Sequence, residues 1–201
     1  MSGIGDNLSC SNNEGLRKLI AQYRGEEDAT EFQQFRAQNL APIENTGKEL
    51  LDHTPVFHGA CAPMSAAWAA LLRDRYNIPA VAVAGNLVME GATVFLCDRN
   101  IPDSTDSPDI VPWDGHCWME VGGYVGDASI FRTARTMHSR SKLRDFVERR
   151  FGLQRGLMLA SRENLSRIDM VYAPKYVLTE TQINALLNGL RLQVQRAYPG
   201  C

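Results

Sequence analysis

Residues 59–88 have the sequence GACAPMSAAWAALLRDRYNIPAVAVAGNLV, which predicts a helix followed by a strand. We expect the helix over residues 61–76, because Pro63 suits a first helical turn and the alanines that follow favour the helix intrinsically. Apolar residues occupy almost every side of this helix, which is typical of a helix at the centre of a fold. The Val- and Ala-rich run after Pro79 predicts a buried strand.

The segments on either side of this stretch predict an α+β domain. Apolar residues at helical spacing come before it, short apolar runs come after it, and a capping box at residues 179–182 begins a last helix. Expected helices lie at about residues 16–23, 26–39, 42–52, 61–76, 142–151 and from 182 onward, and expected strands at 80–84, 87–89, 93–96, 116–121, 124–127 and 170–178. Helices that flank a block of strands favour the α+β class.

Length and composition indicate one ordinary globular domain. The chain has 201 residues, of which 44% are hydrophobic and 22% are charged. Residues 1–15 are rich in Gly, Ser and Asn, so we expect a flexible arm there. A single domain over residues 16–201 is expected to follow it.

Charge and hydropathy argue against two classes of partner. The net charge is −2, which gives no electrostatic basis for binding nucleic acid. No apolar run approaches the roughly 18 residues that span a membrane, and the N-terminus carries no secretory signal. We therefore expect no nucleic-acid or membrane partner and a cytoplasmic location, with export independent of a signal peptide as the alternative. The oligomeric state stays open.

The five cysteines point to one reactive thiol and not to a disulfide framework. Their spacing is irregular and no Cys-x-x-Cys pair occurs, which argues against structural zinc as well. Cys61 is the strongest candidate, because the start of a helix favours a thiolate and its N–H groups can hold an oxyanion. Gly59 allows a sharp backbone turn before it. The alternative is that Cys61 is a small packing residue.

A predicted hairpin places His116 and Asp127 on one face of a sheet. Two short apolar runs flank a Gly-Gly pair at 122–123, and a two-residue turn there pairs Val121 with Tyr124. Because side chains alternate along a strand, Asp127 then lies one diagonal step from His116, where it could orient the imidazole. A three-residue turn would reverse this face. Each residue taken singly could also be purely structural.

Two segments resemble the core of the transglutaminase-like superfamily. In that family a Gly-x-Cys helix leads to an Asn-Ile-Pro-Ala turn and a Val-rich strand, and a His-Ala-Trp-Val-Glu-Val strand, a short turn and an Asp come later. Residues 59–88 contain GAC and NIPA, and residues 115–128 contain HCWMEVGGYVGD, in the same order. The resemblance covers residues 59–128, about a third of the chain.

The resemblance implies a papain-like α+β fold in which a central Cys-bearing helix packs on an antiparallel sheet, with extra helices at both ends. It also implies a catalytic core at about residues 53–130, with Cys61 as nucleophile, His116 as base and Asp127 as the orienting group. Papain-type enzymes place an oxyanion-binding Gln six residues before the cysteine, where this chain has Pro55. The backbone N–H of Cys61 is then one oxyanion donor, and His58 and Trp113 are candidates for the second.

These roles imply acyl transfer through a thioester on Cys61. The thiolate attacks an amide or ester carbonyl, and His116 returns the proton to the leaving amine. Water as acceptor gives a cysteine protease or amidase, which we favour, and an amine acceptor gives a transglutaminase or N-acyltransferase. We expect no cofactor and no metal. The expected substrate is a peptide, a protein or a small amide, and a cationic one if the acidic loop at 98–114 overlies the site.

Two other classes stay open. His58, Cys61, His116, Cys117 and Asp127 include residue types that bind zinc, although adjacent residues 116 and 117 point to opposite faces of a strand. A binding module that keeps the fold without catalysis is the second alternative, because the Gln is missing. The reactivity of the Cys61 thiol separates this module from an enzyme.

Overall fold

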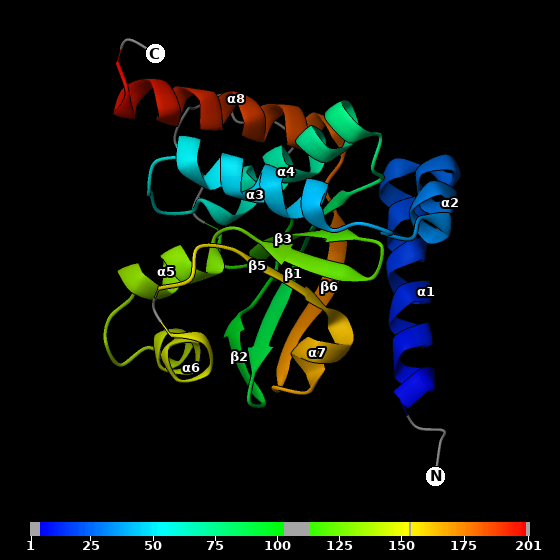
Figure 1. Ribbon diagram of the computed structural model, residues 1–201, viewed down its shortest axis with the longest axis horizontal. Helices are drawn as coiled ribbons and strands as arrows, with labels where there is room; N and C mark the ends of the chain where they lie inside the picture. The colour runs from blue at the N-terminus through cyan, green and yellow to red at the C-terminus, as the bar shows by residue number, and fades with distance from the viewer. Residues whose placement is uncertain (1–4, 103–112, 153, 200–201) are drawn as a thin grey trace.

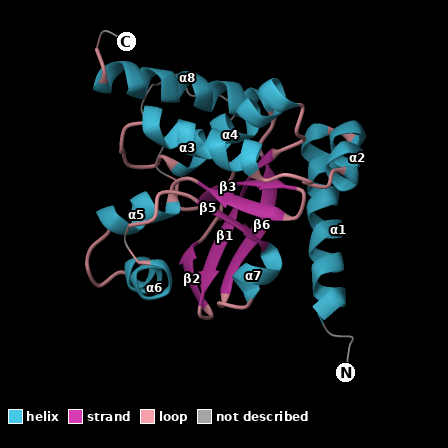
Figure 2. Ribbon diagram, in the orientation of Figure 1, coloured by secondary structure: helices cyan, strands magenta, loops and turns pink. Residues whose placement is uncertain are grey.

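The computed structural model, which describes residues 5–102, 113–152 and 154–199, has an α+β fold built on one antiparallel sheet (Figures 1 and 2). The class is the one that the order of predicted elements indicated. The helices are α1 Gly5–Arg24, α2 Glu26–Gln34, α3 Ala41–His53, α4 Cys61–Tyr76, α5 Ile130–Thr136, α6 Lys142–Phe151, α7 Arg162–Ser166 and α8 Glu180–Ala197. The strands are β1 Val81–Met89, β2 Ala92–Phe95, β3 His116–Val121, β4 Tyr124–Asp127, β5 Met158–Ser161 and β6 Met170–Val177.

The long strand β1 organises the sheet. Val83 pairs with Trp118 of β3 and with Val177 of β6, so these two strands lie on opposite sides of β1. The strand β2 pairs with the far end of β1, and the order continues from β3 through β4 to β5. Because β3 and β4 are antiparallel neighbours, the start of β3 and the end of β4 meet at one end of the sheet.

Helices cover both faces of the sheet, so the domain has two apolar cores. On one face α3, α4 and α8 pack against residues such as Ala82 of β1 and Met119 of β3 (Figure 1). On the other face and along the β6 edge, α1, α2, α5 and α6 enclose the alternate residues, such as Val83 and Trp118. Strands covered on both faces have near-continuous apolar runs, which is what the sequence shows for β1.

Small residues let α4 approach the sheet closely. Trp68 of α4 is fully buried, and its indole N–H donates to the carbonyl of Ile43 in α3 at 3.0 Å. A Cβ atom at Gly126 of β4 would lie 2.7 Å from the Trp68 ring, so only glycine fits there. The helix ends at Asn77, whose φ of 52° lies in the left-handed region that Asn tolerates. The predicted bounds of this helix agree with the structure.

The structure differs from the sequence analysis at the N-terminus and in β1. We expected a flexible arm over residues 1–15, but α1 already begins at Gly5. Propagating a helix adds one hydrogen bond per residue, so a helix held by buried Leu16 and Ile20 can extend through polar residues. The two strands expected at 80–84 and 87–89 are one strand, with a register shift against β6 at Gly85. Over the described part of the chain, no helix is both long and apolar enough to cross a bilayer.

We predict that Gly85→Ala destabilises the domain, because an added Cβ would lie 2.1 Å from the carbonyl oxygen of Ala173. Forcing β1 and β6 apart at this point should lower the free energy of unfolding by about 1–3 kcal/mol. The measurement is urea denaturation followed by circular dichroism. The control is Gly189→Ala in α8, where nothing lies within 4 Å of the added atom and stability should rise slightly. Equal effects of the two substitutions would contradict the prediction.

Candidate active site

His116 and Asp127 form a buried hydrogen bond at the end of the sheet where β3 begins and β4 ends. The register pairs Val121 with Tyr124, as a two-residue turn requires. The turn glycines, Gly122 and Gly123, have φ values of 54° and 86°. His116 Nε2 lies 2.6 Å from Asp127 Oδ2, and the two side chains are 1% and 0% exposed. The diagonal placement expected from the sequence is therefore present.

Five hydrogen bonds hold the Asp127 carboxylate. Oδ1 accepts from the backbone N–H of Ser129, the hydroxyl of Ser129 and the backbone N–H of Ile130, each at 2.9 Å. Oδ2 accepts from His116 and from the hydroxyl of Tyr172, the latter at 2.9 Å. Burial opposes the charge, but His116 and these donors outweigh it and lower the pKa of Asp127. The group is therefore an ionised carboxylate with every lone pair in use.

Cys61 is the first residue of α4, and its side chain acts on the His116 imidazole. Gly59 has a φ of 75°, so the chain turns through a conformation that favours glycine two residues before the thiol. The thiol is half-buried, and the Cys61 side chain is one of the groups that favour the protonated form of His116. Asp127 occupies Nε2 of the imidazole, which leaves Nδ1 for another partner. Cys61 is thus the one member of the group that solvent reaches.

The charges around His116 favour its protonated form. Burial alone lowers the pKa of the imidazole, but the Asp127 carboxylate and then the Cys61 side chain outweigh it, and together they raise the pKa to about 10. The arrangement places a proton donor, the imidazolium, near the sulfur of Cys61.

Aromatic rings close the space around the His116–Asp127 bond. Phe95 of β2 stacks on the imidazole with ring centroids 4.9 Å apart and planes 13° from parallel. Tyr172 of β6 lies on another side, with ring centroids 6.0 Å apart, and Trp118 packs edge-on against Tyr172. These rings keep water from the bond, which strengthens it. The sequence analysis did not identify Phe95 or Tyr172. Both lie near His116 only because β2 and β6 pair with β1, and local sequence patterns do not reveal the order of strands in a sheet.

Glu120, Trp118 and Arg162 form a second buried hydrogen-bond network. Glu120 is 1% exposed, and it accepts from the Trp118 indole N–H at 2.6 Å and from the Arg162 guanidinium. Burial raises the pKa of Glu120 despite its pairing with Arg162. Arg162 also donates to the backbone carbonyl of Tyr172 at 2.8 Å. This network fixes the strand segment that carries the Tyr172 hydroxyl.

Several residues singled out from the sequence lie elsewhere. Cys117 is fully buried on the α4 side of the sheet, and burial raises the pKa of its thiol well above the usual value. The Trp113 indole N–H donates to the carbonyl of Arg99 at 2.8 Å, and His58 is exposed. Most of the acidic loop predicted at 98–114 lies outside the described residues. Among the residues that are described, no three His, Cys, Asp or Glu side chains are grouped to hold a metal ion.

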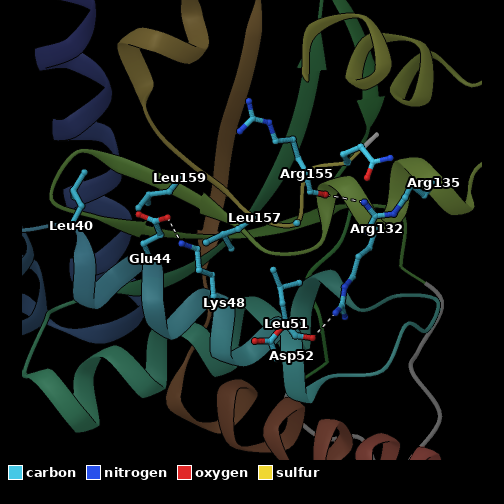
Figure 3. A pocket seen from close by; sticks show the side chains of 12 residues that line it. Leu40, Glu44, Lys48, Leu51, Asp52, Arg132, Arg135, Arg155, Leu157 and Leu159 are labelled. Carbon is cyan, nitrogen blue, oxygen red and sulfur yellow. Dashed lines mark hydrogen bonds and ion pairs between the residues drawn. The ribbon is translucent and has the colours of Figure 1, made fainter. Parts of the chain in front are cut away.

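A separate pocket of about 730 Å³ lies between α3, α5 and the segment before β5 (Figure 3). In Figure 3 Arg132 reaches the carbonyl of Leu51 at 2.5 Å, and it also donates to the carbonyl of Thr54 at 2.8 Å. Arg135 donates to the carbonyl of Arg155 at 2.8 Å. These two side chains brace the backbone. Arg132 in particular connects the segment that leads to Cys61 with α5, the helix that begins after Asp127.

We predict that Arg132→Gln lowers the free energy of unfolding by about 1–3 kcal/mol, because carbonyls of Leu51 and Thr54 lose a charged donor. Arg155→Gln is the matched control in the same pocket. Its side chain is exposed and only its backbone carbonyl is used, so the change should stay within about 0.5 kcal/mol. Chemical denaturation of both variants measures the difference. A loss of stability in Arg155→Gln as large as that in Arg132→Gln would contradict the assignment.

We also predict a pH dependence of stability that comes from His116. The folded-state pKa is raised above the ordinary 6.5 to about 10, so the stabilising contribution is fully present below pH 6.5 and is lost as the pH rises through about 10. Denaturation of the wild type and of His116→Gln at several pH values isolates this contribution. The stability advantage of the wild type should shrink steadily between pH 6.5 and pH 10. An advantage that stays constant over this range would show that His116 is neutral.

Comparisons of the chain with protein-family models, with curated proteins and with solved structures gave no match. What the site can do therefore follows from its own geometry and chemistry.

Proposed function

We propose that this protein is a cysteine-dependent acyl-transfer enzyme with a papain-like, transglutaminase-like fold. The observation that carries the proposal is the buried 2.6 Å bond from His116 Nε2 to Asp127 Oδ2, with Cys61 at the start of α4 acting on the same imidazole. In this reading Cys61 is the nucleophile, His116 is the general base and acid, and Asp127 orients the imidazole. The α+β class, the antiparallel sheet and the start of α4 at Cys61 are consistent with that fold.

The proposed reaction has two halves. In the proposed resting state the proton of Cys61 lies on the His116 imidazole, and the thiolate sulfur attacks the carbonyl carbon of an amide. As the bond from carbon to nitrogen breaks, His116 gives the proton to the leaving amine and a thioester remains on Cys61. Water, activated by the now neutral imidazole, attacks the thioester and releases the acid. Asp127 stabilises the imidazolium in both halves.

The first turn of α4 is the proposed site of the oxyanion. The first N–H groups of a helix have no intrahelical acceptor, and here these include the N–H groups of Cys61 and Ala62. The next residue, Pro63, has no N–H, and the N–H of Met64 donates to the carbonyl of Ala60 at 3.0 Å. Both N–H groups lie at the positive end of the helix dipole. They would replace the Gln donor whose position is taken by Pro55.

Hydrolysis of an amide or peptide bond is the preferred activity, because water is always available as acceptor. The substrate would be a peptide, a protein or a small amide. A transglutaminase or N-acyltransferase would use the same three residues with an amine as acceptor, so the acceptor distinguishes these activities and the triad does not.

We predict that iodoacetamide alkylates Cys61 rapidly at pH 6.5, where an ordinary thiol of pKa about 8.5 is mostly protonated. His116→Ala should slow this reaction about tenfold or more, because the thiolate loses its cationic partner. Peptide mapping by mass spectrometry identifies the labelled cysteine and gives its rate.

The matched control is His138→Ala, which removes an exposed histidine outside the site and should leave the rate unchanged. Cys97 and Cys117 are buried and should label slowly in every variant. A Cys61 rate that is ordinary at pH 6.5 and insensitive to His116→Ala would reject catalysis. It would favour a binding module that retains the fold.

A further inference from the structure

The two oxygens of the Asp127 carboxylate accept hydrogen bonds from different parts of the structure. Oδ1 accepts only from Ser129 and Ile130, at the point where α5 begins. Oδ2 accepts from His116 at 2.6 Å and from the Tyr172 hydroxyl at 2.9 Å. The oxygen that supports the imidazole is therefore shared with a second donor.

We propose that Tyr172 is a positioning residue of the proposed reaction, whose hydroxyl limits how strongly Asp127 Oδ2 holds the His116 imidazolium. This inference rests on the proposed function and assigns a role to a residue outside the Cys61, His116 and Asp127 group. Tyr172 acts through Asp127 and touches no reacting atom.

The carboxylate does not need Tyr172 to stay in place. Three hydrogen bonds to Oδ1 already fix its plane and its rotamer. The Tyr172 ring is itself held, because Trp118 packs edge-on against it with centroids 5.0 Å apart and Arg162 donates to its carbonyl. Removing the hydroxyl alone should leave both groups where they are. The effect of the hydroxyl is then on charge more than on geometry.

The physical effect follows from sharing one acceptor. A donor on a carboxylate oxygen stabilises the negative charge and reduces the attraction that this oxygen offers to a second donor. Tyr172 remains a donor throughout the relevant pH range, because burial and the nearby Asp127 raise the pKa of its hydroxyl well above the usual value. The Tyr172 hydroxyl therefore stays neutral, and its hydrogen bond to Asp127 weakens the attraction between the Asp127 carboxylate and the His116 imidazolium.

The titratable groups that act on His116 come from three elements. Asp127 of β4 and Cys61 of α4 both favour the imidazolium. Tyr172 of β6 reaches it only through Asp127. The rings of Phe95 and Trp118 carry no charge. Glu120 and Arg162 form an ion pair with each other, so their opposite charges largely cancel at the imidazole.

A limit on the carboxylate's hold is useful in the proposed reaction. The imidazolium must give its proton to the leaving amine, and an imidazolium held too strongly is a poor acid. The Asp127 carboxylate and the Cys61 side chain already stabilise the charged form of His116 against the effect of burial. The Tyr172 hydroxyl offsets part of that stabilisation and keeps the proton transferable.

The test is Tyr172→Phe in the full-length protein, with nuclear magnetic resonance titration of ¹³C-labelled histidine. The titration midpoint of His116 should move to higher pH, so that the ratio of imidazolium to imidazole at pH 10 rises about threefold to tenfold. Tyr176→Phe is the matched control. It removes a buried hydroxyl from the same strand, one that accepts from the Ile101 N–H at 2.6 Å, and should leave His116 unchanged.

A second variant changes the donor in the opposite direction. Replacement of Tyr172 by 3-fluorotyrosine makes the phenol a stronger donor, so the His116 midpoint should move to lower pH. This variant keeps the hydroxyl and decides the question even where Tyr172→Phe does not fold. A midpoint that is unchanged, or that moves against the stated direction in either variant, overturns the inference.

The role of Tyr172 and the proposed function can be tested separately, because each depends on a different measurement. Rapid alkylation of Cys61 that depends on His116, together with an unmoved midpoint in the Tyr172 variants, would overturn this inference alone. Slow alkylation that ignores His116 would overturn the proposed function as well.

Discussion

The hydrogen bond between His116 and Asp127 strongly constrains the structure, because both partners are almost completely buried. A buried carboxylate without partners is very costly, and this one is satisfied by five donors from β3, β6 and the start of α5. Each donor fixes one element relative to the others. The strand order, the two-residue turn and the position of α5 are therefore linked to a single side chain.

Close packing of α4 on the sheet brings Cys61 toward this bond. The faces of α4 and β1 that meet are built of small residues, with Ala66 and Ala69 on the helix and Ala82 and Ala84 on the strand. Small residues allow the helix to lie near the sheet, so its first residue reaches the end where β3 begins. From the other side, Arg132 of α5 donates to the carbonyls of Leu51 and Thr54, which precede Cys61. Helix, sheet and loop thus converge on Cys61.

The sequence predicted the elements whose signals are local. The bounds of α4, β3, β4 and α6 agree with the structure, because capping residues, Gly-Gly turns and apolar spacing define them within a few residues. The hairpin register placed Asp127 beside His116 because the period of a strand is two. Phe95, Tyr172 and Arg132 could not be found this way, since they reach the site through sheet order and through α5. The early start of α1 was missed because the polar residues there give no periodic signal.

The central claim is that Cys61 carries an acyl group during turnover, and intact-protein mass spectrometry tests it most directly. The protein is mixed with an activated acetyl ester and sampled over time. The account predicts one acetyl group, located on Cys61, that forms quickly and then decays as water releases it, and that does not form in His116→Ala. Acetylation scattered over exposed lysines, with none on Cys61 or with no dependence on His116, would contradict the account.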